Sequence, residues 1–137
     1  MIFVCAMTMA QTNAYPLLPM PQNYKVTDKS FAMGKVKLST PVLKSEWEAF
    51  IVNAGGELAD KAAAEIKVEL LPVIDGVKLN PDEAYRLSVS GKLIKIEAVT
   101  ERGVYWALQT LRQLEKKKGK KSLFAGCEIV DWPAFRI

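Results

Sequence analysis

The sequence predicts an α+β domain in which two helices pack on one face of a mixed, mainly antiparallel sheet. Residues 66–70, 84–90 and 92–99 alternate apolar and polar side chains, as half-buried strands do. Residues 41–53 and the segment that follows Thr100 repeat apolar residues at the spacing of an amphipathic helix. A strand–helix–strand unit therefore lies on either side of a central hairpin, which implies a mixed sheet covered by both helices.

The length and charge of the chain indicate one domain without a nucleic-acid partner. Its 137 residues are within the range of a single domain, and half of them are apolar, enough for a self-sufficient core. The net charge is +4, but five lysines lie within residues 116–121, and without them it is −1. This local cluster has no interleaved aromatic residues, unlike a surface that follows a phosphate backbone. We expect a solvated helix end instead.

Cysteine and histidine usage excludes several kinds of site. The chain has no histidine, and its two cysteines, Cys5 and Cys127, lie far apart. This leaves no ligand spacing for zinc and no Cys/His or Ser/His/Asp catalytic set, so we expect no metal and no cofactor. Cys127 lies in an apolar strand pattern and is expected to be a small buried hydrophobe.

The first residues have the composition of a secretory signal. The segment MIFVCAMTMA is apolar, is followed by polar QTN, and carries Thr8 and Ala10 as small residues at a cleavage site. We interpret residues 1–14 as the remnant of a signal peptide and a linker, which predicts export to the periplasm or the extracellular space. The alternative is an ordinary apolar first strand. The segment is too short to span a membrane.

The next elements are a strap, two short strands and a helix. Residues 15–22 contain three prolines and are expected to form an extended segment at an edge, followed by strands at 24–26 and 36–39. The helix is expected within residues 41–53, followed by a possible further helical turn at 57–65. Ser45 and Glu48 have the spacing of a capping box, Gly55 and Gly56 end the helix, and one apolar face consists of Trp47, Phe50, Ile51 and Ala54.

The central hairpin is the clearest local prediction. Asp75 and Gly76 form a turn signal after the strand at 66–70. In the next two strands Tyr85, Leu87 and Val89 alternate with polar residues, as do Ile94, Ile96 and Ala98. Ser90 and Gly91 are expected to form the two-residue connection between them.

The second helix is expected to start at Thr100 as its N-cap, with Glu101 in the first turn, where the dipole favours a negative charge. Its apolar stripe comprises Val104, Ala107, Leu108, Leu111 and Leu114. Lysines at its end would complement the helix dipole, and Gly119 would stop it. Residues 116–121 then form a tether to a last strand at 123–130, and Pro133 ends the pattern.

The carboxylates of the chain are not expected to be catalytic. The pairs Asp82 with Glu83 and Glu97 with Glu101, and the single Asp131, each have a structural interpretation in a turn, on a strand face or at a helix start. Gly103 is better explained by close packing of the helix on the sheet than by phosphate binding. We therefore assign no catalytic residue to this chain.

Candidate contacts with another domain lie near the end of the chain. Gln109 and Thr110 lie on the flank of the second helix and either contact a neighbour or form a solvated face. Trp132 and Phe135 follow the last strand, where aromatic residues usually dock on a further domain. With Asp131, from the motif Asp131-x-Pro-x-Phe135, these residues form our candidate inter-domain contact.

Three blocks of sequence together resemble a known family. They are LLPMPQ, then EAYRLSV with IKIEA and GVYWALQTLRQL, and finally IVDWPAFRI. In this order they resemble the non-catalytic N-terminal domain of the β-N-acetylhexosaminidases of glycoside hydrolase family 20. The resemblance spans residues 17–137, and we interpret residues 15–137 as this α+β domain.

The resemblance implies a parent enzyme that removes terminal β-linked N-acetylhexosamine from glycans. The family performs this reaction in a (β/α)₈ barrel with an Asp-Glu pair, and the acetamido group of the substrate is the nucleophile. None of those residues is present here, so the chain is expected to be truncated before its barrel. The implied partners are the downstream barrel and, through it, the glycan.

Two alternatives remain open at this stage. In the first, the chain is a stand-alone carbohydrate-binding or interaction module, with Trp132, Phe135 and Tyr15 stacking on sugar rings. In the second, it is the accessory domain of a different glycosidase family. An isolated scaffold domain would bind no sugar and would associate through the patch that a barrel normally covers.

Overall fold

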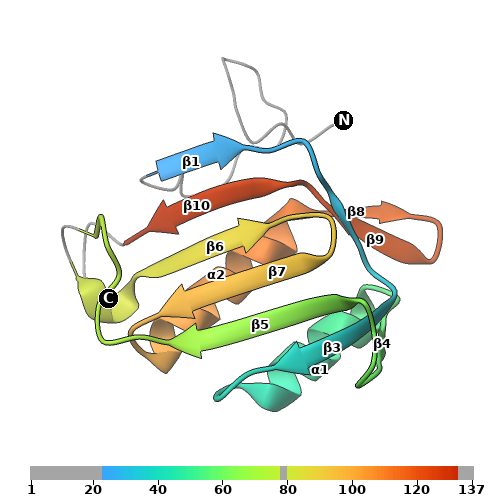
Figure 1. Ribbon diagram of the computed structural model, residues 1–137, viewed down its shortest axis with the longest axis horizontal. Helices are drawn as coiled ribbons and strands as arrows, with labels where there is room; N and C mark the ends of the chain where they lie inside the picture. Colours follow the sequence, from blue (N-terminus) through green and yellow to red (C-terminus); the bar gives the residue numbers. More distant parts are fainter. Residues whose placement is uncertain (1–22, 78–79, 133–137) are drawn as a thin grey trace.

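The computed structural model describes residues 23–77 and 80–132, which form two sheets and two α-helices (Figure 1). The larger sheet has the strand order β1-β10-β6-β7-β5-β3-β4, and the smaller has the order β2-β9-β8. In chain order the elements are β1 (Asn23–Val26), β2 (Phe31–Ala32), β3 (Lys35–Ser39), α1 (Lys44–Asn53), β4 (Glu57–Leu58), β5 (Ala64–Leu70), the 3₁₀ helix η1 (Pro81–Glu83), β6 (Tyr85–Val89), β7 (Leu93–Ala98), α2 (Glu101–Leu114), β8 (Glu115–Lys118), β9 (Lys121–Phe124) and β10 (Cys127–Asp131).

The predicted fold class is confirmed. Five of the eight strand pairings among the described residues are antiparallel, and the three parallel ones join β3 to β4, β3 to β5 and β5 to β7. Both helices lie on the same face of the larger sheet (Figure 1). The core forms between that face and the helices, because the inward residues of the strands and the apolar stripes of α1 and α2 belong to one buried cluster.

The opposite face of the larger sheet is polar. Lys95 on β7 lies 3.6 Å from both Glu69 on β5 and Glu97 on its own strand, and Arg86 on β6 lies 3.3 Å from Glu97. These residues alternate with the buried ones along each strand, as expected for a sheet with one solvated face. The apolar contacts of the sheet are therefore made on the helix side.

The central hairpin and the helix faces are also as predicted. Tyr85, Leu87 and Val89 of β6 are buried, and the apolar residues of β7 and α2 lie in the same cluster. The hairpin connection lies one residue further along than expected, because the Ser90 amide donates to the Leu93 carbonyl at 2.9 Å. The turn at Gly76 is present, with φ of 88°. Cys127 is fully buried, as expected for a small hydrophobe.

The predicted capping box of the first helix is wrong. Helix α1 starts at Lys44, so Ser45 lies inside its first turn, and its hydroxyl donates to Glu46 Oε1 at 3.3 Å. Leu43 occupies the cap position in the left-handed region, with φ of 57°. The Thr40 hydroxyl, which donates to the Val42 carbonyl at 2.7 Å, orders the chain just before it. The S-x-x-E spacing therefore predicts the cap at Ser45, whereas Leu43 occupies the cap position.

The predicted helical turn at residues 57–65 is also wrong. Gly55, at φ of 83°, turns the chain away from α1. The Glu57 amide then donates to the Gly34 carbonyl at 2.9 Å, and β4 pairs in parallel with β3. Because these hydrogen bonds come from a distant strand, they override the local helix propensity of the alanines that follow.

The lysine-rich tether is in fact a β-hairpin. Helix α2 ends at Leu114, and residues 115–118 pair with 121–124 as β8 and β9, around a turn in which Gly119 has φ of 67°. The expected last strand at 123–130 is therefore two strands, β9 and β10. Gly126 lies between them, where a side chain would overlap the Lys29 carbonyl oxygen. The interpretation of residues 1–22, Pro133 and Phe135 lies outside the described residues.

Candidate functional site

A buried carboxylate ties the chain before β6 to helix α2. The side chain of Glu83, at the end of η1, is 1% exposed. The Arg102 guanidinium and the Trp106 indole N–H each donate to it, both at 3.3 Å. A buried charge is costly unless it is paired and hydrogen-bonded, and these two donors lie four residues apart on one face of α2. Glu83 therefore joins the helix to the sheet.

A second polar cluster lies one turn further along the helix. The hydroxyl oxygens of Tyr85 and Thr110 are 2.5 Å apart, and the Tyr85 hydroxyl also donates to Asp131 Oδ2 at 3.5 Å. Burial, together with the nearby Asp131 carboxylate, raises the pKa of Tyr85 well above its ordinary range. The phenol thus stays protonated at neutral pH and can donate to Asp131. We call Glu83, Tyr85, Arg102, Trp106, Thr110 and Asp131 the polar network.

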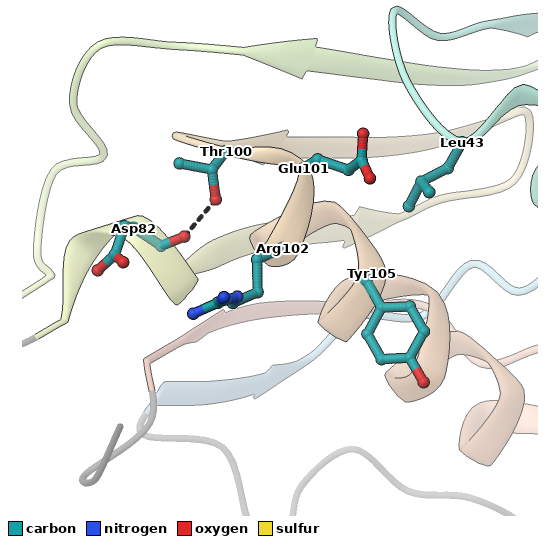
Figure 2. A pocket seen from close by; sticks show the side chains of 6 residues that line it. All are labelled: Leu43, Asp82, Thr100, Glu101, Arg102 and Tyr105. Atoms are coloured by element: carbon teal, nitrogen blue, oxygen red, sulfur yellow. Dashed lines mark hydrogen bonds between the residues drawn. The ribbon is translucent and has the colours of Figure 1, made fainter. Parts of the chain in front are cut away.

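Close backbone approach makes this arrangement possible. A side chain at Gly103 would overlap the Ala84 carbonyl oxygen and lie 2.9 Å from the Ala98 side chain. The first turn of α2 therefore rests directly on β6 and β7, as expected from the sequence. Thr100 occupies the N-cap position, but its hydroxyl donates to the Asp82 carbonyl instead of capping the helix. This bond fixes η1 beside the start of α2 (Figure 2).

A surface depression of about 540 Å³ lies beside this helix start. Its lining residues are Leu43, Asp82, Thr100, Glu101, Arg102 and Tyr105. Figure 2 shows the carboxylates of Asp82 and Glu101 pointing in different directions, with Tyr105 directed away from both. A glycosidase of the two-carboxylate kind needs its acid and its second carboxylate to face the same bond. The depression does not have that arrangement.

The structure brings some of the candidate contact residues together. Thr110 and Asp131 meet at Tyr85, and the Trp132 amide donates to Asp131 Oδ1 at 3.0 Å. Gln109 is the neighbour of Thr110 on α2 and accepts a hydrogen bond from Arg112 at 3.5 Å. Thr110 is 8% exposed, so its hydroxyl serves a bond within the domain. Phe135 lies outside the described residues.

Sequence reasoning missed the rest of the polar network. The sequence pattern predicts Glu83 as a turn residue and Tyr85 as an apolar-face residue of a strand, and neither prediction includes a contact with α2. The signal that could have found the network is the spacing of Arg102, Trp106 and Thr110. Because residues four apart lie on one face of a helix, these three form a row beside the apolar stripe.

Two kinds of feature are absent from the part of the chain that the structure describes. No three His, Cys, Asp or Glu side chains gather there in a way that could hold a metal ion. None of its helices is long and apolar enough to cross a membrane.

The sequence over residues 14–132 matches the family Glycosyl hydrolase family 20, domain 2, and the chain belongs to this family. The resemblance to a non-catalytic family 20 domain is thereby confirmed. No curated protein matches the chain. The matched residues run from before β1 to the end of β10 and include every residue of the polar network.

The chain is similar to several solved structures. The GH20 exo β-N-acetylglucosaminidase from Vibrio harveyi, in complex with N-acetylglucosamine, is 29% identical with a TM-score of 0.69, covering 95% of this chain and 21% of that chain. The Streptomyces plicatus N-acetyl-β-hexosaminidase is 19% identical with a TM-score of 0.65, covering 88% and 27%. CpGH84B is 17% identical with a TM-score of 0.72, covering 90% and 24%.

The last two likenesses show the fold alone, because their sequence identity is low. The chain spans between 21% and 27% of the length of these three proteins. The family match identifies the chain as domain 2 of a family 20 enzyme, an accessory domain.

Proposed function

We propose that this chain is the non-catalytic N-terminal domain of a β-N-acetylhexosaminidase, and that it supports a (β/α)₈ barrel that hydrolyses terminal N-acetylhexosamine from glycans. The observation that carries the proposal is the match to domain 2 of family 20 over residues 14–132. The likeness to the Vibrio harveyi exo β-N-acetylglucosaminidase, of which the chain covers 21%, also supports the proposal that this chain is one domain of a larger enzyme.

The proposed contact with the barrel is formed by Gln109, Thr110, Asp131, Trp132 and Phe135. The polar network supports this role, because it ties α2 and β10 together through Tyr85 just before the chain continues past Trp132. The position of the chain where it leads into a barrel would therefore be fixed. Thr110 and Asp131 would act by holding this geometry, while Gln109 and Trp132 would present their side chains to the partner.

Two further parts of the proposal concern the ends and the location of the protein. Residues 1–14 are the remnant of a signal peptide and a linker, and residues 15–137 are the accessory domain. The parent enzyme is exported to the periplasm or the extracellular space. The composition of MIFVCAMTMA supports both statements, and sequencing the N-terminus of the mature protein would test them.

The experiment that tests the enzyme is an assay of the longer gene product beside this chain on a chromogenic β-N-acetylglucosaminide. We expect hydrolysis by the longer product and none by the 137-residue chain. A longer product that is inert on hexosaminides would sink the proposal and favour another glycosidase. The fold likeness to CpGH84B, whose name does not place it in family 20, makes that the alternative to examine next.

A second assay addresses the stand-alone binding module. Chito-oligosaccharides are titrated into the 137-residue chain and followed by calorimetry. We expect no binding, because the depression near α2 presents only Tyr105 as an aromatic side chain. Millimolar or tighter binding that Trp132→Ala abolishes would instead identify a carbohydrate-binding module.

A further inference from the structure

We propose that the β8–β9 hairpin is a docking site for an anionic phospholipid surface. We call Lys116, Lys118, Lys120 and Lys121 the basic hairpin. This inference concerns a part of the molecule that the candidate site does not use, so it holds whether or not the parent enzyme is a hexosaminidase.

Of the five clustered lysines, Lys117 alone forms a side-chain hydrogen bond or ion pair with another described residue. Lys117 donates to the Asn53 carbonyl at the end of α1, at 2.8 Å, and lies 3.0 Å from Glu115. A lysine at a helix C-terminus complements the helix dipole, but the helix concerned is α1 and not α2. The four lysines of the basic hairpin form no ion pair with a carboxylate among the described residues.

The arrangement of the remaining lysines opposes folding. In the β8–β9 register Lys118 faces Lys121, and Lys116 faces Leu123. Residues that face each other across an antiparallel pair lie on the same side of it, so Lys116, Lys118 and Lys121 share one face. Like charges directly opposite each other destabilise a sheet. Stability alone would place an acid at one of these positions, so the cluster requires another explanation.

The hairpin is attached to the rest of the domain along β9, close to its turn. The Ser122 amide donates to the Ala54 carbonyl at 3.0 Å, and its carbonyl accepts from the Met33 amide at 2.9 Å. A side chain at Gly55 would overlap the Lys120 carbonyl oxygen, so the chain just after α1 packs closely against the turn. At Gly119 in the same turn, nothing lies within 4 Å of an added side chain, so this side of the turn is open. The lysines are therefore presented on a fixed projection at one end of the molecule (Figure 1).

The chemistry of this projection fits a phospholipid surface. Lysine is a flexible point charge that pairs with phosphate without demanding a particular geometry. The open side of the turn at Gly119 can meet a flat array of headgroups. The aromatic residue of the hairpin, Phe124, is buried and cannot stack on bases or sugars. Clusters of lysine beside anionic lipid add binding energy with each charge.

Vesicle sedimentation tests the proposal with the 137-residue chain. The vesicles contain phosphatidylcholine alone or mixed with phosphatidylglycerol. The test variant changes all four residues of the basic hairpin to glutamine and leaves Lys117 in place. The control variant changes four exposed lysines elsewhere to glutamine, namely Lys25, Lys37, Lys44 and Lys61. Both variants lose the same net charge.

We expect the unchanged chain to bind the mixed vesicles and not the phosphatidylcholine vesicles, with binding that weakens as salt rises. The test variant should bind at least about tenfold more weakly, and the control should lose much less. The thermal unfolding temperature of the test variant should not fall, because the Lys118–Lys121 repulsion is removed. Equal losses in the two variants, or no sedimentation at low salt, would overturn the proposal. Tighter binding to duplex DNA or to a soluble sulfated polysaccharide at the same salt would overturn it as well.

Discussion

Gly103 determines how closely α2 approaches the sheet. Its Cα hydrogen faces the Ala84 carbonyl oxygen, and a methyl group there would overlap that atom. The Glu83 and Tyr85 contacts with α2 lie on either side of this point. A single residue without a side chain therefore sets the helix position on which the polar network depends.

We expect Gly103→Ala to lower the free energy of unfolding by about 1–3 kcal/mol, as overpacking does in a closed interior. This loss outweighs the gain of about 1 kcal/mol that alanine brings to a helix interior. Urea denaturation of the 137-residue chain measures it. The matched control is Gly91→Ala, where the nearest atom to the new methyl group is the Lys29 Cβ at 3.9 Å. Equal effects at the two glycines would contradict the packing argument.

Tyr85 links protonation to stability. Its pKa is raised in the folded state by burial and by Asp131. The unfolded chain therefore loses the Tyr85 proton first as pH rises, so the stabilisation is complete below about pH 10, the ordinary pKa, and declines above it. The slope of the decline approaches about 1.4 kcal/mol per pH unit.

The variant Tyr85→Phe isolates this effect. At pH 7 it should lower the free energy of unfolding by about 1–2 kcal/mol, because the buried Thr110 hydroxyl loses its partner. Above pH 10 the gap between variant and parent should shrink. Urea denaturation of both proteins between pH 7 and 11 measures the gap, and Tyr105→Phe, at an exposed tyrosine, is the control. A gap that stays constant across this range would contradict the raised pKa.

At the scale of elements, the start of α1 shows how a correct helix can have an incorrect cap. The apolar face of Trp47, Phe50 and Ile51 fixed the helix in the sequence, and all three residues are buried. The S-x-x-E spacing is satisfied by any serine and glutamate three apart, including a pair inside the first turn. Which residue caps a helix depends on where the preceding chain turns, and that is decided here by Leu43 and Thr40.

The variant Ser45→Ala tests this reading. A serine that caps a helix contributes about 1 kcal/mol, whereas Ser45 bonds only to an exposed Glu46. We therefore expect a change of less than about 0.5 kcal/mol in the free energy of unfolding. Thr40→Ala, which removes the bond to the Val42 carbonyl, should destabilise the chain more. A larger loss at Ser45 than at Thr40 would restore the capping box.

The sequence pattern does not predict the β8–β9 hairpin or the strand β4, and the reason is the same for both. Both are short, and both are held by partners distant in the sequence: Ser122 by Ala54 and Met33, and Glu57 by Gly34. The run of lysines has no alternation of apolar and polar residues, so periodicity could not identify a strand. Longer segments with a buried face, such as β6 and β7, carry their own signal.

For the whole molecule, the candidate contact makes a prediction about the longer gene product. In that product the double variant Gln109→Ala with Trp132→Ala should weaken the docking of the domains, with a loss of about 1–3 kcal/mol, since buried tryptophans dominate many interfaces. Calorimetric unfolding of the longer product should show it, and unfolding of the 137-residue chain should change less.

The control for this experiment is Val52→Ala with Leu58→Ala. These two apolar residues are 64% and 41% exposed and belong to α1 and β4, away from the proposed contact. Their removal should affect the longer product and the short chain alike. If the double variant at Gln109 and Trp132 also affects both forms equally, the inter-domain assignment is wrong.

The sequence by itself determined the class of fold, the central hairpin, the apolar faces of both helices and the family. These features depend on periodicity and on motif order, which are local properties of the chain. The tertiary structure alone decided that Glu83 and Tyr85 join α2 to the sheet, that Thr110 and Asp131 both bond to Tyr85, and that the lysines form a hairpin. The physical reason is that hydrogen bonds and charges between distant segments depend on where the packed core places them, and local sequence does not encode that placement.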